Sequence, residues 1–363
     1  MPLKPLKPLK PLKPLKEDAS IPARRWTAGR PPRHILAIRL QAMGDVVITL
    51  PYLNDLKRRY PETAIDLLTR EETGAIPKNL ELFQRVRTIG GGRNFKRQWL
   101  ASARLLPQLF WSRYDVVLDL QNNEISRFVT KCLRPHAWSR FDKMSPRSAG
   151  ERTRHTIEAA GLGPVRLNTA LPTRGAGAAL RLLQEAGWRE GHRLVALNPA
   201  GAFATRNWPL QSWVGFARAW QSLDSTPTQF LLLGLDTMKA KASFIEGALA
   251  GRALNLVGRT TPDEAFSIVQ KADLVLSEDS GLMHMAWVSG VPTLALFGSS
   301  RGDWSRPLGE RTLCLHSGDL SCGSCMEATC RYGDVHCLTR YEPRPVAEMA
   351  FSLLRPDSDS EDN

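Results

Sequence analysis

The chain of 363 residues is too long for one ordinary hydrophobic core, so its length predicts two domains. Hydrophobic residues make up 42% of it, which is enough for both cores, yet no uninterrupted apolar run is long enough to cross a bilayer. The N-terminus also lacks the apolar segment and cleavage site of a secretory signal, so we expect a cytoplasmic protein.

The net charge is strongly positive, at +13. Five lysines in the first 16 residues and four acids after residue 356 nearly cancel, so the body alone carries +12. Such an excess suits a partner rich in phosphate, which includes nucleic acid, an anionic membrane surface and a nucleotide-linked substrate.

The chain begins with Pro-Leu-Lys repeated five times over residues 2–16. Proline at every third position prevents a helix and favours an extended chain with its lysines in solvent. We predict a disordered basic tail over residues 1–31, with a weak tether to anionic membrane as the alternative.

The first domain is predicted over residues 32–175. The run at 34–40 is apolar enough for a buried parallel strand, and helical spacing follows it to residue 59. Further strands are predicted at 64–69, 85–89 and 114–120, with helices at 98–110 and 150–160.

The same alternation returns in a second domain, predicted over 176–343, before a C-terminal helix at 344–356 and an acidic tail at 357–363. Both halves therefore predict an α/β fold of two doubly wound, Rossmann-like parallel sheets, with a ligand in the central cleft at the carboxyl ends of their strands. The strands of the second domain are predicted at 194–198, 229–234, 253–257, 273–277 and 293–297.

Gly44 and Asp45 directly follow the first strand. The glycine allows a tight turn, and the aspartate lies at the mouth of a helix that faces the predicted cleft. The spaced glycines of a dinucleotide site are missing. Asp45 is either a helix cap or a catalytic carboxylate, and both interpretations stay open on this motif alone.

A second polar turn follows the strand at 273–277, where Asp279, Ser280, Gly281 and His284 open a helix. The N-terminus of a helix offers free N–H groups and partial positive charge to a pyrophosphate. The alternative is a capped helix with a polar first turn.

A third loop carries Gly201 and then Arg206, just before Trp208 and Pro209. The planar guanidinium of Arg206 could hold diphosphate oxygens, and the alternative is a surface arginine beside a buried tryptophan.

These motifs, in this order over residues 34–350, resemble glycosyltransferase family nine, the ADP-heptose lipopolysaccharide heptosyltransferases. The resemblance implies a GT-B fold and an inverting, metal-independent transfer of a sugar, heptose from ADP-heptose, to a lipopolysaccharide-core acceptor. It implies that Asp45 is the general base and that Gly44 and Gly201 support the turns. The donor contacts that it implies are Arg206, Asp236, Asp279, Ser280, Gly281 and His284.

The reaction itself requires a base in one domain and a diphosphate site in the other. Displacement of a nucleoside diphosphate needs a base on the acceptor side and positive charge on the leaving side. Two departures from the family pattern, Gly201-Ala202 and Gln121-Asn122, put the sugar and the acceptor in doubt more than the reaction class. No metal is needed for catalysis if helix termini and Arg206 neutralise the diphosphate.

Four cysteines fall within 16 residues of a segment at 314–337. This density favours a structural zinc, but disulfides and unligated thiols are also open, and no catalysis is expected there. The cysteines are Cys322, Cys325, Cys330 and Cys337.

Two other functions fit parts of the sequence. A nucleotide-sugar epimerase would share the two-domain cleft, and the positive charge could serve nucleic acid, although no recognised binding module is present. We expect a nucleotide sugar and a lipid-linked saccharide as partners, peripheral contact with the anionic inner face of the inner membrane, and no nucleic acid.

Overall fold

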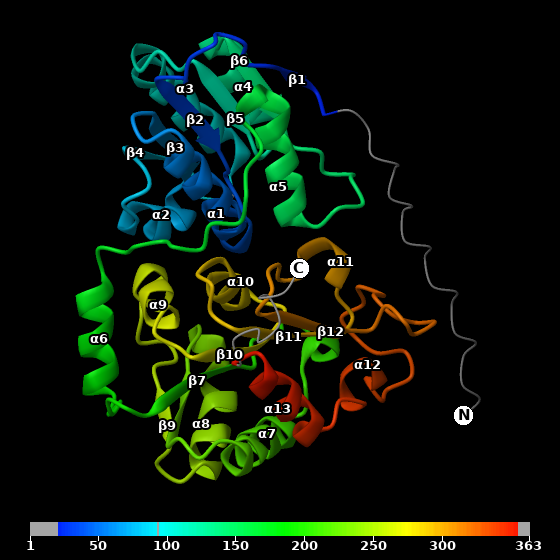
Figure 1. Cartoon of the computed structure of the whole chain (residues 1–363). Coiled ribbons are helices and arrows are strands. Elements are labelled where there is room, and N and C mark those ends of the chain that lie inside the picture. The colour runs from blue at the N-terminus through cyan, green and yellow to red at the C-terminus, as the bar shows by residue number, and fades with distance from the viewer. Residues whose placement is uncertain (1–20, 93, 355–363) are drawn as a thin grey trace, which may run out of the picture.

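The computed structural model describes residues 21–92 and 94–354 (Figure 1). The Pro-Leu-Lys repeat and the acidic tail lie outside the described residues. Two α/β domains follow one another along the chain, and each is built around a six-stranded sheet.

The first sheet has the strand order β1-β6-β5-β2-β3-β4 and is parallel except for β1. Its central strands read as short apolar runs because helices cover both faces. The strands are β1 (Ala23–Arg24), β2 (His34–Ile38), β3 (Ala64–Arg70), β4 (Arg85–Ile89), β5 (Val116–Asp119) and β6 (Ala137–Arg140).

The helices of the first domain divide between the two faces of this sheet. Leu109 of α3 and Val129 of α4 pack with strand residues into one core, while α1 and α5 contribute to a second core on the other face. The helices are α1 (Met43–Arg59), α2 (Ala75–Asn79), α3 (Phe95–Trp111), α4 (Glu124–Leu133) and α5 (Ala149–Ile157).

The second sheet has the order β12-β11-β10-β7-β8-β9 and is parallel throughout. The strands are β7 (Arg193–Asn198), β8 (Thr228–Leu232), β9 (Ala253–Asn255), β10 (Leu274–Glu278), β11 (Thr293–Phe297) and β12 (Thr312–His316). The helices are α6 (Ala176–Glu185), α7 (Leu210–Leu223), α8 (Lys239–Ala248), α9 (Pro262–Val269), α10 (Gly281–Val288), α11 (Gly302–Ser305), α12 (His336–Thr339) and α13 (Pro343–Ser352).

The two domains share one hydrophobic cluster. Leu50 and Leu53 of α1 belong to the same cluster as Met285 and Val288 of α10, and these two helices pack against each other across the domain junction. Because α1 follows β2 and α10 follows β10, the carboxyl edges of the two sheets face one another (Figure 1). The predicted fold of two facing parallel-sheet domains is therefore confirmed.

The boundary of the predicted N-terminal tail is wrong. Ala23–Arg24 pairs with β6 at the edge of the first sheet, and the backbone N–H of Trp26 donates to Ala160 O. Backbone pairing thus orders part of a segment whose composition predicts disorder. Strands β6 and β12 and helices α4 and α6 are further elements that the sequence does not predict. In the described residues, no helix is long and apolar enough to cross a membrane.

Candidate functional site

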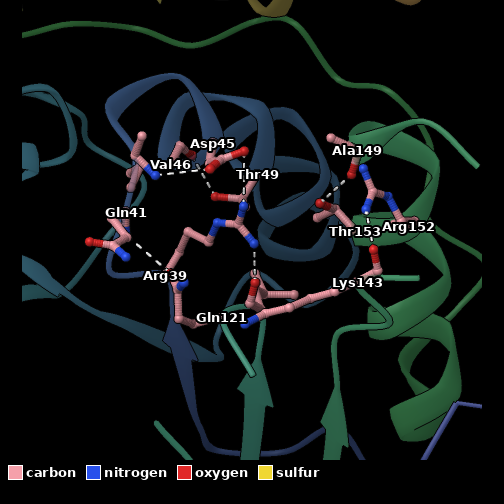
Figure 2. A network of polar contacts seen from close by, with 12 residues as sticks. Arg39, Gln41, Asp45, Val46, Thr49, Gln121, Lys143, Ala149, Arg152 and Thr153 are labelled. Atoms are coloured by element: carbon pink, nitrogen blue, oxygen red, sulfur yellow. Dashed lines mark hydrogen bonds and ion pairs between the residues drawn. The ribbon is translucent and has the colours of Figure 1, made fainter. Parts of the chain in front are cut away.

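Asp45 lies in the first turn of α1, and both of its carboxylate oxygens are engaged. Oδ2 accepts a hydrogen bond from the backbone N–H of Ala42 at 2.9 Å, and Oδ1 forms an ion pair with Arg39 at 2.9 Å (Figure 2). The side chain remains 39% exposed. The carboxylate therefore caps the helix and, at the same time, faces solvent, so it can also meet a ligand.

A cavity of about 410 Å³ opens beside Asp45. Figure 2 shows Arg39 next to this carboxylate and Lys143 and Arg152 on the side of α5. The guanidinium groups of Arg39 and Arg152 lie 4.8 Å and 5.3 Å from the ring centre of Phe141. The aromatic ring thus holds two cations at one wall of the cavity.

The cavity carries more positive than negative charge. Burial lowers the pKa of Lys143, and the charges of Arg127 and Arg39 lower it further. Burial likewise lowers the pKa of Arg152, as does the charge of Arg39, although nearby carboxylates, including that of Asp45, oppose the shift. Within the described chain, neither Lys143 nor Arg152 has a carboxylate at ion-pair distance, so an anionic ligand would relieve this repulsion.

Across the cleft, the N-terminus of α10 forms the second half of the site. Ser280 caps the helix, with Oγ accepting from the N–H of Met283 at 3.4 Å and donating to Asn198 Oδ1 at 2.7 Å. No atom lies within 4 Å of the position that a Cβ on Gly281 would take. The first turn of α10 is therefore open to a ligand at its positive end.

Arg206 and Asp279 lie beside this turn and are paired with each other. Nη1 of Arg206 donates to Oδ2 of Asp279 at 3.3 Å, and the guanidinium lies 5.1 Å from the ring centre of Phe203. The structure therefore brings three of the predicted donor elements together: the loop after β7, the end of β10 and the start of α10.

Glu278 is an unpredicted residue of this site. Its fully buried carboxylate accepts from the N–H of Gly201 at 2.5 Å and of Trp208 at 2.6 Å, and burial raises its pKa to about 7. A Cβ on Gly201 would lie 2.3 Å from Arg206 O, so this loop needs a glycine. The signal in the sequence was an acid at the end of an otherwise apolar strand.

His284 connects the two halves. The indole N–H of Trp287 donates to Nδ1 of His284 at 3.1 Å, which leaves the ring proton on Nε2. Burial lowers its pKa, although the charges of Asp279 and Asp45 oppose that shift. A Cβ on Gly44 would lie only 2.8 Å from Cδ2 of His284, so the helix that carries Asp45 contacts the first turn of α10 directly.

Asp236 lies apart from these residues. It is largely exposed, forms an ion pair with Lys239 at 3.1 Å and packs against the backbone of Gly258. It does follow β8 at the same edge of the sheet, but no hydrogen bond or ion pair in the described chain joins it to Arg206 or to α10.

The four clustered cysteines are half-buried and free, and they line one cavity of about 300 Å³. No disulfide joins any of them in the structure. In the part of the chain that the structure describes, no three His, Cys, Asp or Glu residues lie close enough to hold a metal ion. Burial raises the pKa of Cys337 to about 11, and the neighbouring thiols raise it as well. A structural zinc remains a prediction.

Comparison with known proteins agrees with this geometry. Residues 177–336 match the model of glycosyltransferase family 9 (heptosyltransferase). The chain is also 24% identical to lipopolysaccharide heptosyltransferase 1 of Pseudomonas aeruginosa, over 89% of this chain and 99% of that protein. The chain is therefore similar to the heptosyltransferases of glycosyltransferase family 9, most clearly over its second domain.

Solved structures share the fold of this chain. A family 9 glycosyltransferase of Veillonella parvula superposes with a TM-score of 0.71 at 17% identity, covering 89% of this chain and 97% of that one. The ADP-heptose lps heptosyltransferase II of E. coli gives a TM-score of 0.67 at 20% identity, covering 88% and 98%. The two-domain arrangement is thus that of known family 9 enzymes.

Proposed function

We propose that this glycosyltransferase moves a heptose from ADP-heptose to a lipopolysaccharide-core acceptor, with inversion at the anomeric carbon and without a metal. The names of the similar proteins support the choice of sugar and acceptor. The contact between Gly44 and His284 is the observation that supports the mechanism. Through it, the helix that bears Asp45 packs against the first turn of α10, which is the proposed donor site.

In this mechanism Asp45 takes the proton of the acceptor hydroxyl as the oxygen attacks the anomeric carbon. The new glycosidic bond forms as the bond to the diphosphate breaks, and the nucleoside diphosphate leaves with that electron pair. Arg39 holds the carboxylate in place through the ion pair at 2.9 Å. The acceptor sits in the cavity that Lys143 and Arg152 line.

The leaving diphosphate meets positive charge on the opposite wall. The free N–H groups at the start of α10 and the guanidinium of Arg206 donate hydrogen bonds to its oxygens and stabilise its negative charge. Nε2 of His284 carries the ring proton and can donate to the donor sugar or phosphate. These groups supply the charge stabilisation that a metal ion gives in other transferases.

The test is to incubate the protein with a panel of nucleotide sugars, with and without a lipopolysaccharide-core acceptor, and to analyse the products. The proposal expects a larger glycan only when acceptor and ADP-heptose are both present. A changed donor without acceptor would instead identify an epimerase. Transfer from ADP-heptose that stops when a chelator is added would contradict metal independence.

The cell compartment is part of the same proposal. A lipid-linked acceptor requires the enzyme to work at a membrane surface, so we place it in the cytoplasm, in peripheral contact with the inner face of the inner membrane. The excess of positive charge supports this placement.

A further inference from the structure

Helix α3 exposes an unusual concentration of large apolar side chains. Phe110 is 64% and Trp111 is 83% exposed, and Phe95, Trp99 and Leu100 are exposed as well. Five of the eleven exposed large hydrophobic residues of the described chain thus lie on one helix. Exposed apolar residues that gather in this way mark an interaction surface, whereas isolated ones do not.

The five side chains share one side of the helix. At about 100° per residue they fall within an arc of about 160°, while Ser102 and Leu109 point to the sheet. The ring of Trp99 lies 4.4 Å from the ring of Phe128, so the apolar surface continues onto α4.

Positive charge borders this apolar surface. No acid occurs between residues 94 and 113. On α4 the cations recur at the spacing of one helix face, beside an open hollow of about 670 Å³ that Arg24 and Arg140 also line. The exposed cations are Lys96, Arg97 and Arg104 on α3, Arg127 and Lys131 on α4, and Arg134 directly after α4.

We propose that the surface formed by α3 and α4 docks on an anionic phospholipid membrane, with its aromatic side chains in the interface and its cations on lipid phosphates. Tryptophan and phenylalanine prefer the membrane–water interface, and each nearby cation strengthens binding to an anionic leaflet. The charge of the surface matches that partner.

The proposal rests on the proposed function in one respect: docking must leave the cavity beside Asp45 accessible to an acceptor that is anchored in the same membrane. Helices α3 and α4 follow β4 and β5, so both begin at the edge of the sheet that faces the cleft (Figure 1). The charge of Arg127 on α4 also reaches Lys143 in the cavity beside Asp45. Phe110 and Trp111 lie in the last turn of α3, at the opposite edge of the sheet, so a saccharide anchored in the same membrane would reach that cavity along the length of α4.

Two other occupants fit less well. A second copy of the chain would bring the same cations face to face, which repels. A nucleic acid would satisfy the cations, but it would leave the most exposed apolar side chains, Phe110 and Trp111, without an apolar environment. Single-stranded DNA is therefore included in the test as the competing polyanion.

The test is flotation of the full chain with vesicles of phosphatidylcholine alone or mixed with phosphatidylglycerol. Wild type should bind the mixed vesicles more strongly. Lys131→Gln with Arg134→Gln should weaken that binding about fivefold per cation. Phe110→Ser with Trp111→Ser should weaken it about tenfold or more. The matched controls are Phe244→Ser on α8 and the exposed Lys271→Gln, which should leave binding unchanged.

Three results would overturn the docking surface. They are unchanged vesicle binding by the Phe110/Trp111 double variant, equal losses in the control variants, and binding of wild type to single-stranded DNA but not to phosphatidylglycerol. Because every variant keeps the same N-terminal lysines, the differences report on α3 and α4. Unchanged melting temperatures would show that the variants are folded.

A transfer assay separates this proposal from the proposed function. With a water-soluble acceptor saccharide the docking variants should match wild type, and with acceptor in vesicles they should be slower. Equal slowing with both acceptors would overturn the docking surface. If no protein transfers heptose to either acceptor, the proposed function fails, while vesicle binding still decides the docking surface.

Discussion

Replacing Gly44 by alanine tests the contact between the two halves of the site. The new Cβ would lie 2.8 Å from Cδ2 of His284, whereas carbon atoms normally pack at about 3.5–4.0 Å. His284 is buried and accepts a hydrogen bond from Trp287, so its ring cannot simply rotate away. The helices α1 and α10 must therefore separate by about 1 Å.

The expected cost follows from two opposing effects. Overpacking costs about 1–3 kcal/mol, and the higher helix propensity of alanine returns up to about 1 kcal/mol. We expect a net loss of about 1–2 kcal/mol, seen in thermal unfolding as a decrease of a few degrees in Tm. A misplacement of about 1 Å should lower kcat/KM about 100-fold.

The control is Gly247→Ala on α8, where no atom lies within 4 Å of the new Cβ. That variant should be more stable by about 0.5–1 kcal/mol and fully active. The double variant Gly44→Ala/His284→Ala should lose less stability than the sum of the two single variants, because the clash is absent once the imidazole is removed. A Gly44→Ala protein with the stability and kcat/KM of the control would refute the contact.

Three further variants test single groups of the site. Asp45→Asn should lower transfer by about 10²–10⁴-fold in product assays while ADP still raises the Tm, because only the base is lost; retained turnover would exclude Asp45 as the base. Arg206→Ala should weaken ADP binding about 10–100-fold by calorimetry; unchanged affinity would place the diphosphate elsewhere. Burial raises the pKa of Glu278 from 4.5 to about 7, so the folded state holds this proton more tightly than the unfolded state. The free energy of unfolding should therefore fall by about 3 kcal/mol between pH 4.5 and 7 relative to Glu278→Gln, and parallel denaturation curves would contradict that.

The sequence predicts the strand and the helix on either side of the turn at residues 279–280, because a short apolar run is followed there by helical spacing. These elements are strand β10 and helix α10, and their periodicity and the polar turn between them are local features. Strand β6 reads Ala-Trp-Ser-Arg and has no such run. Its pairing with β5 and β1 depends on distant segments, so a local pattern does not reveal it.

The cavity beside Asp45 was harder to predict for the same reason. Arg39 comes from the end of β2, Lys143 from the loop after β6 and Arg152 from α5, and only the fold joins them in one cavity. Glu278 is next to Asp279 in the sequence, but one carboxylate turns inward to the loop after β7 and the other pairs with Arg206. Adjacent acids thus take different roles because a strand ends between them.

The ion pairs on the two sides of the cleft imply that ligand binding has different consequences there. Asp45 is fixed by Ala42 and Arg39 before any ligand binds, and a hydroxyl can reach its exposed face without breaking either contact. Nη1 of Arg206 already pairs with Asp279, so a diphosphate that binds this guanidinium must use its other N–H groups or displace the carboxylate. A displaced Asp279 would then lie near the negative phosphates unless it turns to a donor hydroxyl. A ligand can therefore meet Asp45 without disturbing its contacts, whereas an anion at Arg206 competes with Asp279 for the guanidinium.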